Sequence, residues 1–187
     1  MNAISQRIHF LRTAVFDREV GAVTRSSKYV IKNVLKHIPK SLDEIVEYGP
    51  GDGILTKLLL RHLSPDGKLI VIESNSEFIK MLNRIDDARL SVVHGKAQDA
   101  VRIVRENGIR SADAIIASMP FSFLNKNERT QIVKDSYAML APGGMLLIFN
   151  QYQPLMASPI KKYFGKAHIA LELRNIPPCF IMYARKK

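Results

Sequence analysis

Short apolar runs alternate with segments of helical periodicity along most of the chain. Seven of these runs are bounded by polar or turn-forming residues and are predicted to be strands: 44–48, 69–72, 90–93, 112–117, 145–149, 169–173 and 180–183. Apolar positions at helical spacing predict helices at 30–38, from 54 onward, and at 75–82, 125–140 and 161–164. Alternating strands and helices predict an α/β fold with a mostly parallel sheet, and the short link between the last two strands predicts an antiparallel end.

The first apolar run ends in a glycine-rich turn that begins a helix near Ile54. Gly49, Gly51 and Gly53 allow positive φ and let the backbone approach a ligand closely, and the free N–H groups that open the next helix favour an electron-rich ligand. Glu73 ends the next run, and a carboxylate there can accept hydrogen bonds from both hydroxyls of a ribose. The sequence therefore predicts a nucleoside-binding crevice at the carboxyl ends of parallel strands.

The spacing within this turn selects the kind of nucleoside. A dinucleotide-binding fingerprint requires glycine where Ile54 stands and does not require an acid before the first glycine. The pattern of Glu47, Gly49, Pro50, Gly51 and Gly53 instead resembles the first motif of class I S-adenosylmethionine-dependent methyltransferases. The alternative is a glycine-rich turn in another α/β fold.

This resemblance implies a Rossmann-like fold with a seven-stranded, mostly parallel sheet, an antiparallel final strand and helices on both faces. It implies S-adenosyl-L-methionine as cofactor and S-adenosyl-L-homocysteine as product. In that family the acid and the glycine loop, here Glu47 and 49–53, lie near the amino-acid end of the cofactor, and the acid at Glu73 holds its ribose.

Length and composition fit one such core. The chain has 187 residues, of which 47% are hydrophobic, and we expect one structural domain in which basic amphipathic helices at 1–40 cap the site of a cofactor-binding domain at 41–187. The single cysteine, Cys179, excludes a disulfide framework and a cysteine metal cluster, and the five histidines show no metal-ligand spacing. Without a signal-peptide core or a membrane-spanning run, the sequence predicts a cytoplasmic protein that at most associates peripherally with a membrane.

The net charge of +11 is concentrated in the two flanks of the chain. Residues 1–40 and 151–187 each carry a net charge of +6, whereas residues 41–150 carry −1. A neutral core with basic flanks predicts an anionic partner, either a phospholipid surface or a nucleic acid. The alternative is a surface whose charge only keeps the protein soluble.

The first sixteen residues have the pattern of a basic amphipathic helix. Apolar residues recur at helical spacing on one face and arginines lie on the other. Such a helix can lie in a lipid interface or pack on the core of the protein. The residues expected to contact a membrane are Ile8, Phe10, Leu11, Arg12 and Phe16.

Two further segments are expected at the cofactor edge of the sheet. After the third strand, many relatives of this fold use an acid to bind the adenine amine, but Lys96 occupies that position, so Ala97 backbone with Gln98 or Asp99 is expected instead. After the fourth strand, 118–121 combines a polar residue, a proline and an aromatic ring, which can orient an amine and stabilise its developing positive charge. The predicted catalytic residues are Ser118, Met119, Pro120 and Phe121. The alternative is a proline turn with a buried phenylalanine.

Five motifs in the same order resemble the bacterial phospholipid N-methyltransferases: 10–12, 21–27, 47–51, 118–120 and 175–178. The resemblance implies successive methylation of phosphatidylethanolamine towards phosphatidylcholine at an anionic membrane surface. It also implies cofactor contacts at Val23, Thr24, Ser74 and Ser118. Arg25, where that family more often has proline, and Lys96 depart from the family pattern and are compatible with another amine acceptor.

The same family is similar to the ribosomal RNA adenine dimethylases, which share the pattern from Glu47 to Thr56. In those enzymes the catalytic loop begins with Asn and ends with Tyr, where this chain has Ser118 and Phe121, and a helical RNA-binding domain follows, for which the sequence leaves no room. RNA is therefore the alternative partner, and a binding module without catalysis is a third possibility. A protonated lipid amine must lose a proton before it attacks, and Tyr48, Tyr152 and His168 are candidate acceptors.

Overall fold

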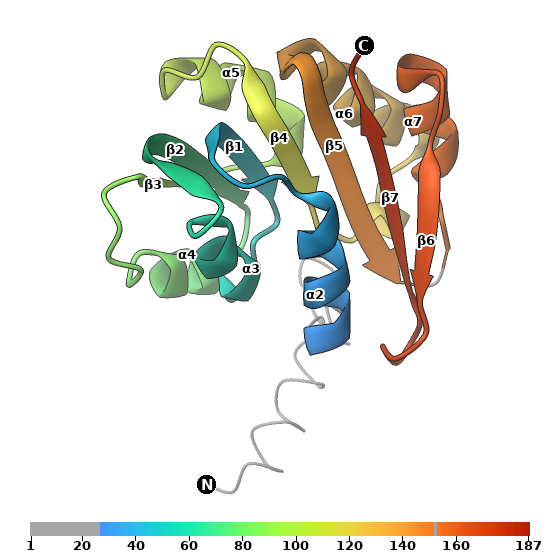
Figure 1. Cartoon of the computed structure of the whole chain (residues 1–187), viewed down its shortest axis with the longest axis horizontal. Coiled ribbons are helices and arrows are strands. Elements are labelled where there is room, and N and C mark those ends of the chain that lie inside the picture. Colours follow the sequence, from blue (N-terminus) through green and yellow to red (C-terminus); the bar gives the residue numbers. More distant parts are fainter. Residues whose placement is uncertain (1–26, 152) are drawn as a thin grey trace, which may run out of the picture.

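The computed structural model describes residues 27–151 and 153–187 and contains one seven-stranded sheet (Figure 1). The strands lie in the order β3-β2-β1-β4-β5-β7-β6, in which β7 is antiparallel to both of its neighbours. Their bounds are β1 Leu42–Tyr48, β2 Leu63–Glu73, β3 Leu90–His94, β4 Ala112–Ala117, β5 Leu140–Gln151, β6 His168–Glu172 and β7 Cys179–Arg185. The predicted mostly parallel sheet with an antiparallel end is confirmed.

Helices cover both faces of the sheet because alternate residues of each strand point to opposite faces. In β1, for example, Ile45 packs into the cluster under one layer of helices and Val46 into the cluster under the other. The first layer contains α2 Lys28–His37, α3 Ile54–Leu59 and α4 Ser76–Leu82. The second contains α5 Ala100–Glu106, α6 Lys126–Met139 and α7 Ala157–Phe164. The short 3₁₀ helices are η1 Ala97–Asp99 and η2 Phe121–Phe123.

Three helices begin at side-chain caps. The Ser27 hydroxyl accepts a hydrogen bond from the Val30 N–H at the start of α2, and the Asn75 side chain accepts from the first N–H groups of α4. Asn125 and Glu128 form a reciprocal capping box at the start of α6. These caps satisfy N–H groups that have no partner within the helix, so they fix where each helix starts.

The sequence analysis did not predict the helix α5, which the structure contains. α5 follows η1 directly and buries Ala100, Ile103 and Val104, which are spaced as one face of a helix. The signal was present, but it is only one turn long and lies next to the expected adenine-binding residues. β5 also begins at Leu140, five residues before the predicted strand, and its pairing with β4 is irregular over this segment, where Gly143 has a positive φ.

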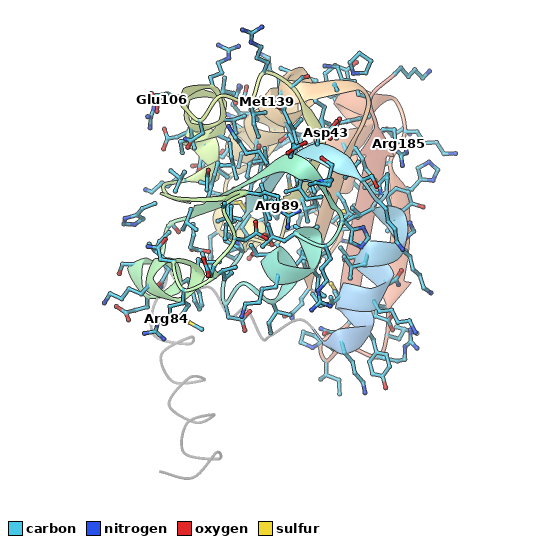
Figure 2. The ribbon with its side chains drawn as sticks, turned by 60° about the vertical axis from the view of Figure 1, so that its left-hand side comes forward. Asp43, Arg84, Arg89, Glu106, Met139 and Arg185 are labelled. Atoms are coloured by element: carbon cyan, nitrogen blue, oxygen red, sulfur yellow. The ribbon has the colours of Figure 1, made fainter. Side chains whose placement is uncertain are left out.

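The amino edge of the sheet, opposite the predicted site, is closed by polar contacts. Asp113 accepts hydrogen bonds from the backbone N–H groups of Asp43 and Glu44, and the Lys186 ammonium donates to the Leu140 carbonyl. Figure 2 shows Asp43 near the start of β1 and Arg185 at the end of β7 on this same side of the molecule. These contacts pair strand-end backbone groups and serve stability, so the candidate chemistry is sought at the other edge.

At the carboxyl edge, the order of the strands reverses between β1 and β4. The chain proceeds from β1 to β2 on one side and returns to β4 on the other side of β1. Loops that leave β1 and β4 therefore diverge, and the space between them is where open α/β sheets bind ligands. The glycine turn after β1 and the 118–121 loop after β4 meet at this position.

Candidate functional site

The glycine turn after β1 adopts the backbone conformation that its sequence requires. Gly49, Gly51 and Gly53 have φ values of +66°, +58° and +76°, which L side chains adopt only with strain. A Cβ atom on Gly53 would lie 3.0 Å from Leu82 Cδ2, so this glycine permits close packing of the turn against α4. A Cβ on Gly51 would meet no atom within 4 Å, so Gly51 faces open space. The turn therefore exposes its backbone at Gly51 and is tightly packed at Gly53.

Glu47 lies beneath this turn and is almost completely buried, with 1% of its surface exposed. The Thr56 hydroxyl donates a 2.7 Å hydrogen bond to Glu47 Oε2, while Oε1 receives no hydrogen bond from the described residues. Burial raises the pKa of Glu47 to about 8, against the smaller opposing effect of the Thr56 hydrogen bond. A buried carboxylate oxygen without a donor fits a ligand that brings an N–H or ammonium group.

Glu73 ends β2 and turns its carboxylate towards the same edge. Its Oε2 accepts from the Gly51 N–H at 3.1 Å, and its Oε1 accepts from the N–H groups of Ser74 and Asn75 at 2.8 and 2.9 Å. These bonds hold the carboxylate between the glycine turn and the start of α4. Glu73 and Gly51, separated by 22 positions in sequence, are thus in direct contact at the edge where the sequence predicts a nucleoside-binding crevice.

The loop after β4 packs directly on the glycine turn. The Ser118 N–H donates to the Tyr48 carbonyl and the Ser118 hydroxyl donates to the Gly49 carbonyl, both at 3.0 Å. A Cβ on Gly49 would lie 3.1 Å from Met119 Cβ, which explains why only glycine fits there. The predicted acceptor loop and the predicted cofactor loop therefore form one surface.

The two aromatic rings of this loop lie in different environments. Phe121 is fully buried and belongs to the core cluster that also contains Tyr48 and Ile132. This burial matches the alternative interpretation of the loop as a proline turn with a buried phenylalanine. A catalytic role for Phe121 next to the methyl group and the amine stays a prediction. Phe123, two residues later, is 59% exposed and was not singled out from the sequence, although an aromatic residue near a polar-X-Pro loop was a signal for it.

The segment after β3 lies next to Glu73 because the Gly95 N–H donates to the Glu73 carbonyl at 2.9 Å. Ala97 is buried at the start of η1, while the next residues face an open surface groove between α5 and α6. This groove is lined by Gln98, Asp99, Val101, Arg102, Arg105, Glu106 and Asp135. Gln98 and Asp99 are therefore near the edge, and their contact with an adenine stays a prediction.

Several predicted residues lie outside the described part of the chain: Val23, Thr24, Tyr152 and the five expected membrane contacts Ile8, Phe10, Leu11, Arg12 and Phe16. Two candidate proton acceptors lie within it, and neither has its side-chain group exposed at the carboxyl edge. The Tyr48 hydroxyl is buried beside the Ser136 hydroxyl, and burial raises the pKa of Tyr48 well above its usual range. His168 is at the far end of β6, where it stacks on Tyr183 at 5.0 Å.

Thr56 is a residue of the site to which the sequence analysis gave no role. It belongs to the motif that begins at Glu47, and its position on the first turn of α3 aims its hydroxyl at the Glu47 carboxylate. Thr56 is fully buried, and buried polar side chains require a partner. A threonine nine residues after a buried acid, on the helix that follows the turn, was the available signal.

A family model described as a methyltransferase domain matches residues 46–146, a range that contains the glycine turn, Glu73 and the 118–121 loop. The ornithine lipid N-methyltransferase of Singulisphaera acidiphila is 24% identical over 169 residues, which cover 89% of this chain and 88% of that protein. A part of the ribosomal RNA small subunit methyltransferase H of Psychrobacter sp. is 32% identical over 93 residues, covering 49% of this chain and 27% of that protein.

Among solved structures, the N-methyltransferase NodS from Bradyrhizobium japonicum WM9, in complex with S-adenosyl-L-homocysteine, superposes with a TM-score of 0.72. The superposition covers 95% of this chain and 97% of that one at 13% identity. The similarity extends to nearly all of both chains, and at this identity it establishes the fold.

Proposed function

The chain belongs to the family of methyltransferase domains, and from this premise we propose that it methylates the amino group of a membrane lipid. The methyl donor is S-adenosyl-L-methionine, which supplies a methyl group activated on a sulfonium and leaves as S-adenosyl-L-homocysteine. The proposed acceptors are phosphatidylethanolamine and its methylated intermediates, presented at an anionic membrane surface. The protein would act in the cytoplasm, peripherally associated with that membrane.

The assignment of the methyl donor rests on the hydrogen bond between Gly51 and Glu73 and on the buried Glu47 beneath the glycine turn. The free Glu47 Oε1 is a suitable acceptor for the ammonium of an amino-acid group, and Glu73 lies where ribose hydroxyls are bound in α/β folds. The open space at Gly51 allows the backbone to approach a ligand. The proposed cofactor contacts are Val23, Thr24, Glu47, Gly49, Pro50, Gly51, Gly53, Glu73, Ser74, Ala97, Gln98 and Ser118.

Two observations support a lipid as the acceptor. The lipid N-methyltransferase similarity extends over most of both chains, whereas the RNA methyltransferase similarity covers about a quarter of that protein. The basic charge is concentrated in residues 1–40 and 151–187, outside the neutral segment that carries the glycine turn and the 118–121 loop. Basic flanks around a neutral site suit a substrate whose charge lies in the surrounding surface.

The loop after β4 is proposed to position the acceptor amine. Ser118 is held by its bond to the Gly49 carbonyl, so the loop is aligned with the glycine turn before any substrate binds, and such alignment lowers the entropic cost of bringing reactants together. Met119 and Pro120 continue the loop next to Ser118, and Phe121 anchors the loop by packing into the core. Phe123 is the exposed ring of the loop that a cationic amine could approach.

The acceptor proton must leave before the amine attacks. Tyr48 and His168 are not placed to receive it, because the first is buried in the core and the second lies away from the carboxyl edge. Release of the proton to water is consistent with the described residues, since an amine at a membrane surface remains in exchange with solvent. Turnover should then rise with pH as the free amine becomes more abundant.

The experiment that tests the function compares three acceptors in parallel. Methyl transfer from isotopically labelled S-adenosyl-L-methionine is measured with vesicles that contain phosphatidylethanolamine, with vesicles that contain ornithine lipid, and with undermodified ribosomal RNA. We expect label in phosphatidylethanolamine. Label only in ornithine lipid would keep a lipid amine and replace the head group, and label only in RNA would overturn the lipid proposal.

A pair of variants links that activity to the site. Glu73→Gln should weaken S-adenosyl-L-methionine binding at least tenfold, because the amide accepts at one atom only and cannot reproduce the hydrogen bonds of both carboxylate oxygens. Glu77→Gln, an exposed position of the neighbouring helix α4, is the control and should bind as the wild type does. Equal affinities in the two variants would contradict the proposed ribose contact.

A further inference from the structure

Exposed aliphatic side chains form a row along the edge strand β6 and continue into the loop after it. We call Ile169, Leu171, Leu173 and Ile176 the apolar ridge. Ile169 and Leu171 alternate along β6 and therefore share one face, while Glu172 is buried on the other, and Leu173 follows in the turn after the strand. Exposure increases towards the loop, where Leu173 is 68% and Ile176 90% exposed. Apolar side chains gathered at a loop tip indicate contact with another apolar phase.

The ridge ends at the edge of the sheet that carries the candidate site. Cys179, the first residue of β7, pairs with Gln151 at the carboxyl end of β5. The loop 173–178 therefore lies at the carboxyl edge, as do the glycine turn after β1 and the 118–121 loop after β4. Figure 1 shows this loop on the same side of the molecule as the first turn of α2.

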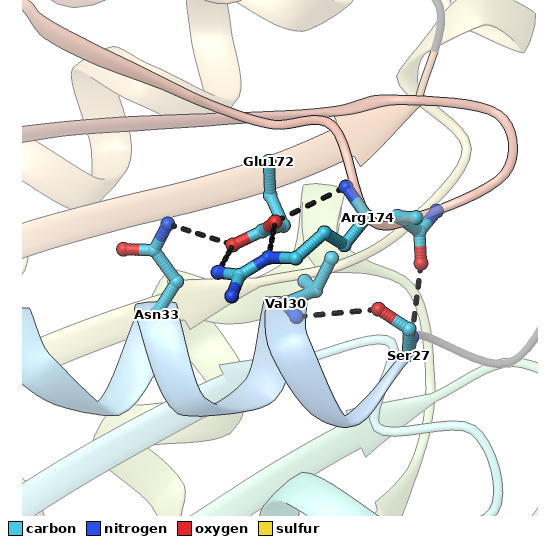
Figure 3. A network of polar contacts seen from close by, with 6 residues as sticks. Ser27, Val30, Asn33, Glu172 and Arg174 are labelled. Carbon is cyan, nitrogen blue, oxygen red and sulfur yellow. Dashed lines mark hydrogen bonds and ion pairs between the residues drawn. The ribbon is translucent and has the colours of Figure 1, made fainter.

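A network of polar contacts holds the loop in place (Figure 3). The Arg174 guanidinium donates to both carboxylate oxygens of Glu172 at 2.7 and 2.8 Å, and it also lies 4.5 Å from the centre of the Tyr29 ring. The buried Asn175 side chain accepts from the Ser27 N–H at 3.0 Å and donates to the Pro177 carbonyl. The loop is thus anchored to the start of α2, and its apolar tip is presented on a fixed base.

The helices on either side of this hairpin are basic. α2, which packs against β6, contains Lys28, Lys32 and Lys36 and no acid. α7, which packs against β7, contains Lys161 and Lys162 and no acid. Lys28, in the first turn of α2, lies beside the loop, since its ammonium is 5.4 Å from the centre of the Tyr29 ring that Arg174 also contacts. Because Arg174 is already paired with Glu172, Lys28 supplies the positive charge next to the exposed apolar tip. An apolar tip beside the basic helix α2 is complementary to an anionic lipid surface, whose phosphates lie above an apolar interior.

We propose that the apolar ridge inserts into the interface of an anionic phospholipid bilayer and turns the carboxyl edge of the sheet towards the membrane. This deepens, and rests on, the proposed lipid acceptor, because a membrane-bound amine can be reached only if that edge faces the bilayer. An RNA partner is a poorer match, since single-stranded bases stack on aromatic rings and the ridge is aliphatic. A second copy of the chain pairing with the edge strand β6 is the competing occupant.

The chain contains no tryptophan, so a single indole reports directly on insertion. Ile176→Trp places it at the tip, and Pro142→Trp places it at an exposed position near the start of β5, at the opposite edge of the sheet, as the control. With vesicles of phosphatidylcholine and phosphatidylglycerol, the emission of Ile176→Trp should shift to shorter wavelength and be quenched by brominated acyl chains. The emission of Pro142→Trp should change little. An unchanged Ile176→Trp spectrum in vesicle-bound protein, or equal quenching in both variants, would overturn the proposal.

The competing occupant has its own signature in this assay. A shift in Ile176→Trp emission that grows with protein concentration in the absence of vesicles would assign the ridge to an interface between copies and overturn the proposal. A shift produced by RNA but not by vesicles would overturn it as well. Only a vesicle-dependent shift that persists at low protein concentration supports insertion.

A second pair of variants measures the contribution of the tip. Leu173→Ser with Ile176→Ser should lower partitioning onto anionic vesicles about tenfold or more, since each large aliphatic side chain loses its apolar surroundings. Pro142→Ser should leave partitioning unchanged, and all variants should keep the affinity for S-adenosyl-L-methionine. Ile169→Ser, farther from the carboxyl edge, should have a smaller effect than Ile176→Ser.

These measurements separate the ridge from the proposed activity. Vesicle binding and quenching require no turnover. Insertion without any methylated lipid would therefore refute the proposed lipid acceptor and leave the ridge proposal intact. Lipid methylation by a Leu173→Ser, Ile176→Ser protein that binds vesicles as tightly as the wild type would remove the ridge proposal alone.

Discussion

The buried Glu47 gives a prediction that can be tested without substrate or cofactor. Its pKa rises from 4.5 to about 8 on folding because burial disfavours the charged carboxylate. Between these values the folded state holds a proton that the unfolded state has lost, so the free energy of unfolding should fall as pH rises from about 4.5 to about 8. Below this window both states are protonated, and above it both are ionised.

The size of this effect follows from the two pKa values. They differ by about 3.5, and each unit is equivalent to about 1.4 kcal/mol, so the full window corresponds to about 5 kcal/mol as an upper bound. Between about pH 5 and about pH 8 the expected loss from Glu47 is about 3 kcal/mol. This is a large share of the stability of an ordinary domain, which is about 5–15 kcal/mol.

Glu47→Gln isolates the contribution of this side chain. The amide keeps an oxygen for the Thr56 hydroxyl but does not ionise, so any cost of burying it is independent of pH. The difference in unfolding free energy between the variant and the wild type should therefore move by about 3 kcal/mol in favour of the variant from about pH 5 to about pH 8.

Urea unfolding of the cofactor-free protein, followed by circular dichroism at a series of pH values, measures this difference. Glu77→Gln, at an exposed position, is the control and should follow the wild type at every pH. If the Glu47→Gln and wild-type curves run parallel across the window, the carboxyl is not buried without a donor as the structure has it. That result would also remove the argument that a ligand ammonium completes the site.

Three further predictions follow from the same coordinates. The affinity for S-adenosyl-L-methionine should rise with pH between about pH 5 and about pH 7, by up to tenfold per pH unit, because an ammonium binds the ionised Glu47; titration calorimetry should show no such rise in Glu47→Gln. Gly51 and Gly143 both have positive φ and room for a Cβ atom, so Gly51→Ala and Gly143→Ala should each lower the free energy of unfolding in urea by about 1 kcal/mol. Only Gly51→Ala should also weaken cofactor binding. Equal cofactor affinities in the two variants would contradict a role of the glycine turn in binding. The Arg174 guanidinium lowers the pKa of Glu172 to about 2, so the stability from this pair is present above about pH 4.5 and is lost as pH falls towards 2. Arg174→Ala should therefore move the midpoint of acid unfolding to higher pH. An unchanged midpoint would contradict the pairing.

The sequence predicted the parts of the fold that depend on local pattern. Apolar runs such as 112–117 became strands because their side chains are buried on both faces of a parallel sheet. Helix starts at Asn75 and Asn125 followed from caps that act over three residues. The helix α5 was missed because a single apolar turn does not stand out from the polar segment around it.

The candidate site was predictable where its geometry is fixed by spacing. The alternating glycines favour positive φ, and Glu73 ends the adjacent strand, so the α/β pattern places the turn and this acid at the same edge of the sheet. Their direct hydrogen bond is a finding of the structure. The burial of Phe121 and the exposure of Phe123 could not be predicted, since both are aromatic residues in the same short loop. Which ring faces the core depends on how the loop packs against α6 and the sheet.

The sequence by itself determined the class of fold, the glycine turn and the separation of basic flanks from a neutral core. Each of these depends on residue type and spacing within a short stretch of chain, so no knowledge of distant contacts is needed. Only the tertiary structure decided that Glu47 Oε1 is buried without a donor among the described residues and that the loop 173–178 lies at the site edge, anchored through Asn175 to Ser27. Ser27 and Asn175 are 148 positions apart in the sequence, and such contacts depend on the order of the strands within the sheet.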